Sequence, residues 1–264
     1  MEKQIQWRGK RLNYQLEGQG QAVILLHGFL ENYHLWDGLI KRLTPKFLVL
    51  AIDLPGFGKS EVYSENHSMN FMAEAVKGIM DHEKLPHALL MGHSMGGYVS
   101  LAFAKLFQDQ TRGLVLFHSQ AAADDEPGKE NRNRTIEVVK KDHKNFISQF
   151  IPLLFAESNI SVFQKEIAHF REESLKTSAA GVIAALAGMR DRDNNLALLS
   201  QLEVPVYFVV GKQDSRIPMG KIIPQLSLPK FSEVLFIDSV GHMGFVEAPE
   251  KIFPALQNFC ERFA

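Results

Sequence analysis

Short apolar runs alternate with longer segments of helical period along most of the chain. Runs of about four to eight apolar residues are typical of strands buried on both faces of a sheet, and helices between such strands favour parallel pairing. The runs that fit this description are residues 22–26, 47–52, 88–91, 113–117, 205–210 and 233–237. Together they predict a doubly wound, mostly parallel sheet of the α/β class.

The first twenty residues follow a different pattern. Residues 4–7 and 12–16 alternate apolar and polar positions on either side of the turn sequence Arg8-Gly9-Lys10. This alternation predicts an N-terminal antiparallel hairpin beside the parallel strands. Farther along, apolar residues recur at helical spacing in residues 71–80, and Ser68 is placed to cap that helix.

The interval 120–195 contains no strand-like run, whereas its apolar residues keep helical spacing. A helical stretch between two strands of a sheet predicts an inserted helical cap, because its amphipathic helices need an apolar surface to cover. We therefore expect a core domain made of residues 1–119 and 196–264, with residues 120–195 forming the cap.

Composition narrows the class of ligand and the compartment. Lys and Arg total 29 and Asp and Glu total 30, so the formal net charge is −1 and no overall field attracts nucleic acid or an anionic membrane. No run approaches the roughly 18 apolar residues of a membrane span. The only cysteine, Cys260, cannot form an internal disulfide, and residues 1–10 lack the apolar run of a signal peptide. These features predict a cytoplasmic protein that acts on a small molecule.

A serine stands between glycines where a strand is expected to meet a helix. The sequence Gly92-His93-Ser94-Met95-Gly96 follows the apolar run 88–91 and precedes a stripe of apolar residues at helical spacing. Small neighbours permit the sharp turn that projects a serine hydroxyl at a helix N-terminus, where backbone N–H groups favour developing negative charge. The pattern predicts Ser94 as a nucleophile.

A nucleophilic serine needs a histidine base and a carboxylate that orients the histidine. Asp214 follows the run 205–210, and His242 follows the run 233–237. Both therefore lie at the carboxyl ends of expected strands, the edge where open α/β sheets build their sites. Asp238 is the alternative acid, but it stands only four residues before His242 and is better placed to end its strand.

Ester cleavage also needs donors for the oxyanion that forms at the carbonyl oxygen. We expect the backbone N–H groups of Phe29, in the loop after the first core strand, and Met95, directly after the nucleophile, to supply them. The side chains of Phe29 and Met95 are candidate pocket residues. The candidates from the cap are Phe146, Phe150, Leu153, Leu154 and Met189.

Five motifs together resemble the capped α/β-hydrolase family of small esterases and carbon-carbon bond hydrolases. They are Leu26-His-Gly-Phe29, Asp53-Leu-Pro-Gly-Phe-Gly-Lys-Ser60, Gly92-His-Ser-Met-Gly-Gly97, Gly211-Lys-Gln-Asp214 and Gly241-His-Met-Gly-Phe-Val-Glu-Ala-Pro249. The resemblance runs from about residue 22 to the C-terminus, outside the cap. It implies the fold, the chain order serine, acid, histidine, and backbone oxyanion donors. Related epoxide hydrolases and haloalkane dehalogenases carry aspartate at the position of Ser94, which argues against both activities.

These expectations describe a serine esterase. Ser94 attacks the carbonyl of a small carboxylic ester, His242 accepts its proton, Asp214 orients His242, and water releases the acid from an acyl-enzyme. The sequence implies no metal and no organic cofactor, since it has no His-Glu-x-x-His pair, no Cys-x-x-Cys and no phosphate-binding glycine motif after a strand.

Two alternatives stay open. The first is a carbon-carbon hydrolase or a lyase acting on a carboxylated metabolite, for which Arg132, Arg134, Arg190 and Arg192 are the candidate cationic anchors in the cap. The second is a ligand receptor that keeps the fold without catalysis. Receptors of this kind typically lose a catalytic residue or an elbow glycine, and this sequence retains them all.

Overall fold

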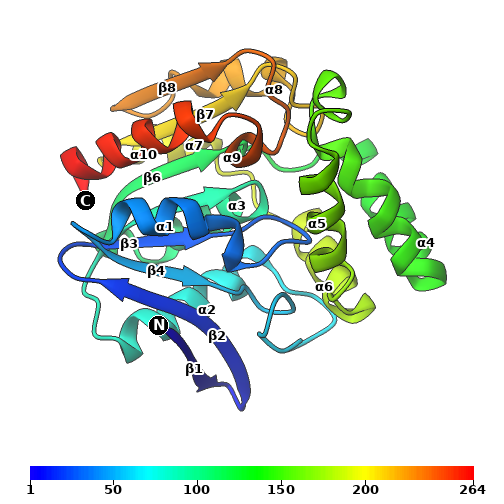
Figure 1. Ribbon diagram of the computed structural model, residues 1–264. Coiled ribbons are helices and arrows are strands. Elements are labelled where there is room, and N and C mark those ends of the chain that lie inside the picture. Colours follow the sequence, from blue (N-terminus) through cyan, green and yellow to red (C-terminus); the bar gives the residue numbers. More distant parts are fainter.

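A computed structural model describes all residues of the chain, 1–264. The protein is built around one eight-stranded sheet (Figure 1). The strands lie in the order β1-β2-β4-β3-β5-β6-β7-β8, and all neighbours from β4 to β8 pair in parallel. Strands β1 and β2 form an antiparallel hairpin, and β2 pairs antiparallel with β4. The strands are β1 (Glu2–Trp7), β2 (Lys10–Gly18), β3 (Ala22–Leu26), β4 (Leu48–Ile52), β5 (Ala88–His93), β6 (Thr111–Phe117), β7 (Val206–Gly211) and β8 (Ser232–Ile237). The predicted fold class is confirmed.

Helices cover both faces of the sheet, which is why its central strands are apolar throughout. Every residue of β3, β5 and β7 is buried. The helices α1 and α10 pack together on one face, and α2 and α3 pack together on the other (Figure 1). Ser68 caps α2 as predicted, because its side chain accepts a hydrogen bond from the Phe71 N–H at 3.1 Å. These core helices are α1 (Asp37–Leu43), α2 (Met69–His82), α3 (Met95–Leu106) and α10 (Pro249–Phe263).

The strand order reverses beside β3, which pairs with β4 on one side and with β5 on the other. In an open α/β sheet, loops at the carboxyl ends of strands diverge at such a point and leave room for a site. The loop after β3 contains Phe29, and the turn after β5 contains Ser94. The topology therefore brings these two sequence-predicted residues to the same edge.

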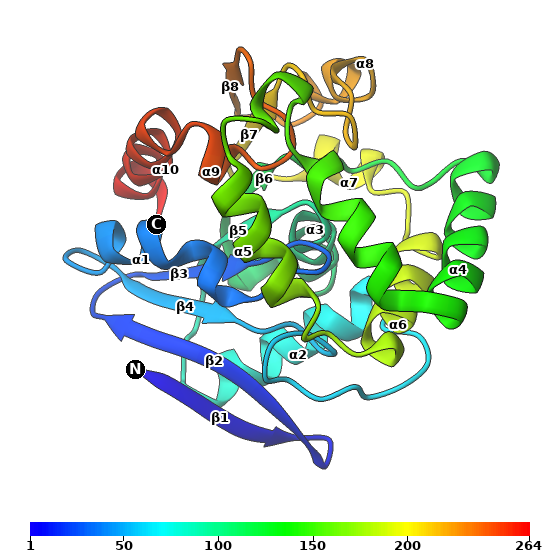
Figure 2. The same cartoon turned by 45° about the vertical axis from the view of Figure 1, so that its right-hand side comes forward.

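The chain between β6 and β7 forms helices and contains no strand. Figure 2 shows α4, α5 and α6 grouped at one end of the sheet, and α4 packs against α6. Helix α4 is interrupted at Asp142, whose φ of −157° and ψ of 84° are not helical. The helices of this segment are α4 (Glu126–Phe150), α5 (Gln164–Ser174), α6 (Ala179–Arg190) and α7 (Leu196–Gln201). The division of the chain into core and cap stays a prediction.

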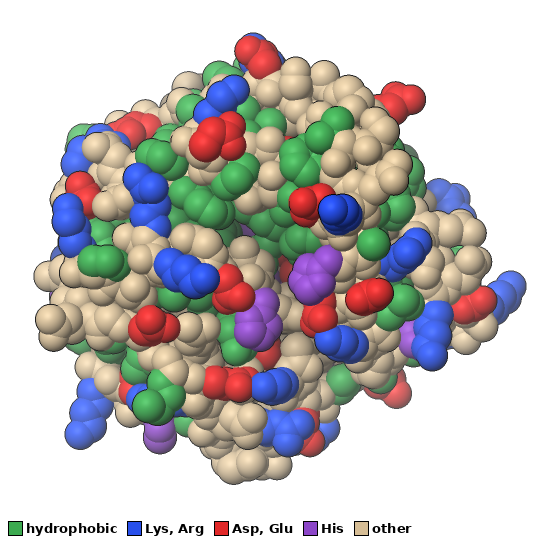
Figure 3. Space-filling model, viewed as in Figure 1, with side chains coloured by type: hydrophobic (Ala, Val, Ile, Leu, Met, Phe, Trp, Pro, Cys, Tyr) green, Lys and Arg blue, Asp and Glu red, His purple; other side chains and the backbone are tan.

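The outer surface has no large region of one charge on the face seen in Figure 3, where acidic and basic side chains are interspersed. This distribution agrees with the formal net charge of −1. None of the helices is both long enough and apolar enough to cross a membrane bilayer.

Candidate active site

Ser94 occupies a strained turn between β5 and α3. Its φ of 49° and ψ of −112° lie outside the regions that residues with a side chain normally adopt. The Ser94 N–H donates to the Phe117 carbonyl at 2.9 Å, and the Ser119 hydroxyl donates to the Ser94 carbonyl at 2.7 Å. Hydrogen bonds from β6 and the residues after it thus hold the turn in this conformation.

The glycines that flank Ser94 are required by close backbone contacts. A Cβ atom on Gly92 would lie 2.2 Å from the Gly96 carbonyl oxygen, and a Cβ atom on Gly96 would lie 2.2 Å from the Leu26 carbonyl oxygen. Backbone atoms cannot move aside as the end of a flexible side chain can. The elbow therefore packs α3 directly against β3, as the spacing of the motif predicts.

Asp214 and His242 form a buried hydrogen-bonded pair. The Nδ1 atom of His242 lies 2.8 Å from Oδ2 of Asp214, while Oδ1 of Asp214 accepts from the backbone N–H groups of Arg216 at 2.8 Å and Ile217 at 2.9 Å. Burial alone would raise the pKa of the Asp214 carboxyl, but His242 and His118 hold that pKa well below its usual range. A carboxylate that accepts the Nδ1–H of a histidine leaves Nε2 able to take a proton.

Asp238, the alternative acid, is directed elsewhere. Its side chain is 79% exposed and forms an ion pair with Lys212 at 2.7 Å. The geometry therefore favours Asp214 over Asp238 as the partner of His242.

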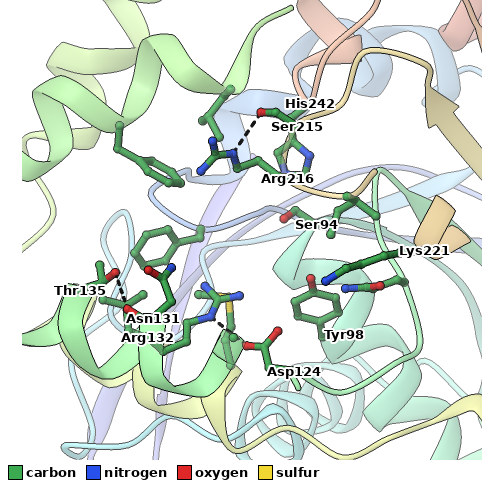
Figure 4. A pocket seen from close by; sticks show the side chains of 18 of the residues that line it. Ser94, Tyr98, Asp124, Asn131, Arg132, Thr135, Ser215, Arg216, Lys221 and His242 are labelled. Carbon is green, nitrogen blue, oxygen red and sulfur yellow. Dashed lines mark hydrogen bonds and ion pairs between the residues drawn. The ribbon is translucent and has the colours of Figure 1, made fainter. Parts of the chain in front are cut away.

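A cavity of about 360 Å³ lies between the carboxyl edge of the sheet and the helices that follow β6. Ser94 and His242 both line it, and Figure 4 shows the serine hydroxyl and the imidazole ring on the same wall. Three stretches of chain that are far apart in sequence thus contribute Ser94, His242 and, behind His242, Asp214. A ligand in this cavity has access to both the hydroxyl and the imidazole.

His118 is a second buried histidine beside Asp214 that the sequence did not point to. Its Nδ1 atom lies 3.3 Å from Oδ2 of Asp214, and its buried Nε2 atom has no hydrogen-bond partner. Burial lowers the pKa of His118 to about 4, so the ring is neutral at pH 7. Ligand atoms of His118, Asp214 and His242 lie within 4.8 Å of one another, which is close enough to hold a metal ion, but the short contacts between these side chains already account for the arrangement.

The backbone N–H groups expected to bind the oxyanion lie at the edge of the sheet where the strand order reverses. The Phe29 N–H belongs to the loop after β3 and donates no hydrogen bond within the protein. Met95 is the first residue of α3, where N–H groups have no acceptor within the helix. The ring of Phe29 lines the cavity and packs edge to face against Phe57 and Phe150, at centroid distances of 6.2 Å and 6.0 Å.

A buried ion pair joins two loops of the site. Glu31 Oε2 accepts from the Gly28 N–H at 2.5 Å and lies 2.9 Å from Nδ1 of His93, whose Nε2 lies 2.9 Å from the carbonyl oxygen of His242. Burial opposes both charges, yet the pKa of Glu31 is lowered by His93 and the pKa of His93 is raised by Glu31. The sequence placed His93 beside the site, but gave no reason to single out Glu31.

The aromatic and aliphatic lining agrees with most of the residues that were expected. Phe29, Phe146, Phe150, Leu154 and Met189 all reach the cavity. Two expectations differ from the structure. The side chain of Met95 is fully buried beneath the turn and does not line the cavity, because the first residue of α3 points into the core. Leu153 is 51% exposed and also lies outside the lining.

The cavity is more polar than the sequence suggested. Of the cap arginines considered as anchors, only Arg132 lines it; Arg134 and Arg190 border a separate surface depression, and Arg192 is buried against the Ala122 carbonyl. Several polar side chains of the lining were not foreseen, because a single polar residue on a helix or in a connection gives no signal in the apolar pattern. They are Tyr98, Gln120, Asp124, Asn131, Thr135, Ser215, Arg216 and Lys221, of which all but Gln120 are labelled in Figure 4.

Comparisons with known proteins all indicate an alpha/beta hydrolase fold. The sequence matches the family described as alpha/beta hydrolase fold over residues 21–249. It is similar to a thermophilic esterase from Thermogutta terrifontis, solved with malate bound, at 31% identity and a TM-score of 0.93, covering 99% of this chain and 98% of that one. It is also 26% identical over 253 residues to the pimeloyl-[acyl-carrier protein] methyl ester esterase of Aeromonas hydrophila, covering 92% of this chain and 96% of the relative. An enol-lactonase from Burkholderia xenovorans, 17% identical with a TM-score of 0.91, covers 98% of this chain and 100% of its own and shares the fold.

Proposed function

The chain belongs to the alpha/beta hydrolase fold family, and from this we propose that it is a serine hydrolase that cleaves small carboxylic esters through an acyl-enzyme. The observation that carries the proposal is the convergence of three groups at one cavity. Ser94 is held in a strained turn, His242 shares the cavity wall, and the Asp214 carboxylate accepts from His242 at 2.8 Å. A serine becomes nucleophilic when a histidine takes its proton and a carboxylate orients that histidine, and these are the three groups that converge here.

In the proposed first step, the Ser94 hydroxyl oxygen bonds to the ester carbonyl carbon while its proton passes to Nε2 of His242. The negative charge that forms on the carbonyl oxygen is stabilised by the N–H groups of Phe29 and Met95. The imidazolium of His242 is stabilised by Asp214, and it then protonates the leaving alcohol as the carbon-oxygen bond breaks. The product is an ester of Ser94.

In the second step, water attacks the acyl carbon and gives its proton to His242. The tetrahedral intermediate collapses, Ser94 recovers the proton, and a carboxylic acid leaves. The cavity of about 360 Å³ limits the substrate to a small molecule or to the end of a larger one. Relatives that are named esterases favour ester cleavage over carbon-carbon cleavage.

Labelling with a fluorophosphonate tests the proposal directly, because such a reagent phosphonylates an activated serine and leaves unactivated serines free. We expect one label per chain, on the peptide that contains Ser94. The Ser94→Ala variant is expected to be unlabelled and to lose at least about 10³-fold in kcat on 4-nitrophenyl esters. Ser227, an exposed serine outside the cavity, supplies the control variant Ser227→Ala.

Normal activity in Ser94→Ala would remove Ser94 from the mechanism. An unlabelled, inactive wild-type protein with an intact fold would instead favour the non-catalytic receptor. Both outcomes are read from the same pair of measurements, labelling and ester turnover, with circular dichroism to check folding.

A further inference from the structure

The cavity has more positive than negative charge on its wall. Its cationic side chains are Arg132, Arg216 and Lys221, and its carboxylates are Glu31 and Asp124. On the face of the molecule seen in Figure 3, acidic and basic side chains are interspersed, so the excess positive charge of the cavity is not part of a larger basic region on that face. The question is which of these charges are already compensated.

Both carboxylates are engaged with other partners. Glu31 is paired with the buried His93 at 2.9 Å. Asp124 accepts from Nε of Arg132 at 3.0 Å and pairs with Arg192 at 2.8 Å. Asp124 is thus shared between two arginines, which leaves it no capacity to neutralise a third cation.

Arg216 and Lys221 have no carboxylate partner. The side chain of Arg216 makes one hydrogen bond, from Nε to the Ser215 hydroxyl at 3.2 Å, and its guanidinium lies 5.5 Å from the ring centroid of Phe150. The Lys221 ammonium forms no ion pair or hydrogen bond within the protein. Figure 4 shows the Lys221 ammonium and the Arg132 and Arg216 guanidinium groups around the space beside Ser94.

Arg216 lines the cavity but is exposed to solvent, so its guanidinium can be reached by a ligand. Partial burial lowers the pKa of Arg216, and the nearby positive charge of Arg132 lowers it further, while the Asp214 carboxylate opposes both effects. The guanidinium keeps its charge at any physiological pH, so the repulsion between the two arginines persists. Two outer nitrogens of Arg216 remain free to donate, and this fork matches the two oxygens of a carboxylate.

We propose that the preferred substrate is an ester that carries a carboxylate of its own, and that Arg216 and Lys221 bind this carboxylate while Ser94 attacks the ester carbonyl. The inference depends on the proposed esterase activity and adds the substrate class to it. Both residues come from the connection after β7, close to Asp214 in the chain. The carboxylate is therefore bound by the same connection that supports the catalytic histidine.

A matched pair of substrates tests the proposal. In 4-nitrophenyl hexanoate the acyl chain ends in a methyl group, and in mono-4-nitrophenyl adipate a carboxylate replaces that methyl group. We expect wild-type kcat/KM to be about tenfold or more higher for the adipate ester, mainly through a lower KM, because each charge-assisted hydrogen bond contributes substantially to binding.

The double variant Arg216→Gln/Lys221→Gln is expected to lower the adipate-to-hexanoate ratio of kcat/KM by about tenfold. The matched control is Arg134→Gln, which removes an exposed arginine of α4 outside the cavity and is expected to keep the wild-type ratio. Free adipate should also inhibit the wild type competitively, and inhibit the double variant more weakly.

The failure of this inference can be distinguished from failure of the esterase proposal. A wild-type enzyme that is labelled at Ser94 but hydrolyses the hexanoate ester as well as the adipate ester would overturn the carboxylate site alone. The same conclusion would follow if the double variant kept the wild-type ratio. A protein that hydrolyses neither ester and is not labelled would overturn both proposals.

Discussion

Nδ1 of His93 lies 2.9 Å from a carboxylate oxygen of Glu31, and both side chains are buried. The other ring nitrogen, Nε2, lies 2.9 Å from the carbonyl oxygen of His242. A carboxylate and a carbonyl can only accept hydrogen bonds, so His93 must donate from both nitrogens and carries a positive charge. The pair connects the loop after β3, through Gly28, to the loop that carries His242.

The first prediction concerns this pair. Glu31→Gln keeps the shape of the side chain but removes the charge that stabilises protonated His93. We expect a loss of about 1–3 kcal/mol in the free energy of unfolding near pH 6, since a buried charge loses its compensation. Chemical denaturation measures this loss. We also expect kcat to fall more than KM rises, because the pair positions His242 through the His242 carbonyl oxygen.

The pH dependence of that loss follows from the raised pKa of His93. A raised folded-state pKa gives stabilisation that is complete below the unfolded value of about 6.5 and disappears as pH rises through the folded value. The difference in unfolding free energy between wild type and Glu31→Gln should therefore be larger at pH 6 than at pH 9. A difference that stays constant with pH would contradict a charged His93.

The second prediction separates the two candidate acids. Asp214→Asn presents an amide to His242 and disfavours the tautomer in which Nε2 is free to accept a proton. We expect kcat for 4-nitrophenyl esters to fall by about 10⁴-fold with little change in KM. Asp238→Asn is the matched control, because Asp238 is exposed and pairs only with Lys212, and it should retain wild-type kcat. The opposite result would exchange their roles.

The sequence predicted the fold and the convergence of the site for definite physical reasons. Apolar runs mark buried strands, and the carboxyl ends of parallel strands meet at one edge, so Ser94, Asp214 and His242 could be placed together without coordinates. The strand ends were less accurate. β5 extends through Gly92 and His93, which pair with Leu116 and Phe117 through backbone groups that leave no apolar signal.

The polar residues that surround Ser94, Asp214 and His242 could not be predicted in the same way. Glu31 and His118 are single polar residues in connections, and only the packed structure shows that Glu31 meets His93 and that His118 meets Asp214. Arg216 and Lys221 look like ordinary solvated charges in the sequence. Their proposed role in binding an anion depends on which carboxylates of the cavity already have a cationic partner. Such pairs join residues that are far apart in the sequence, so the spacing of residues along the chain does not reveal them.

The third prediction tests the close packing of the elbow. Gly96→Ala would place a Cβ atom 2.2 Å from the Leu26 carbonyl oxygen, and α3 would have to shift to relieve the contact. We expect a destabilisation of about 1–3 kcal/mol or more and a large loss of labelling at Ser94, because the shift displaces the turn. Gly220→Ala is the control, since a Cβ atom there meets nothing within 4 Å. Melting temperature and rate of fluorophosphonate labelling are the measurements.

The fourth prediction uses the only cysteine. Cys260 is buried in α10, and burial raises the pKa of its thiol, so the reactive thiolate is scarce and inaccessible in the folded protein. We expect no reaction with a thiol reagent such as dithionitrobenzoate under native conditions and one equivalent in denaturant. Rapid modification of the native protein would show that α10 detaches locally. The inert thiol also ensures that labelling by serine reagents is not confused with cysteine modification.

The backbone at Ser94, with its φ of 49° and ψ of −112°, has a consequence for how the protein can evolve. Unfavourable dihedrals of this kind cost on the order of 1–3 kcal/mol, and a glycine at that position would relax the chain while removing the hydroxyl that the proposed mechanism requires. Folding stability and turnover therefore make opposite demands on one residue. Variants that are selected for a higher melting temperature and must stay active are expected to gain stability at positions away from this turn. Where activity is not required, replacing Ser94 by glycine is expected to raise the free energy of unfolding.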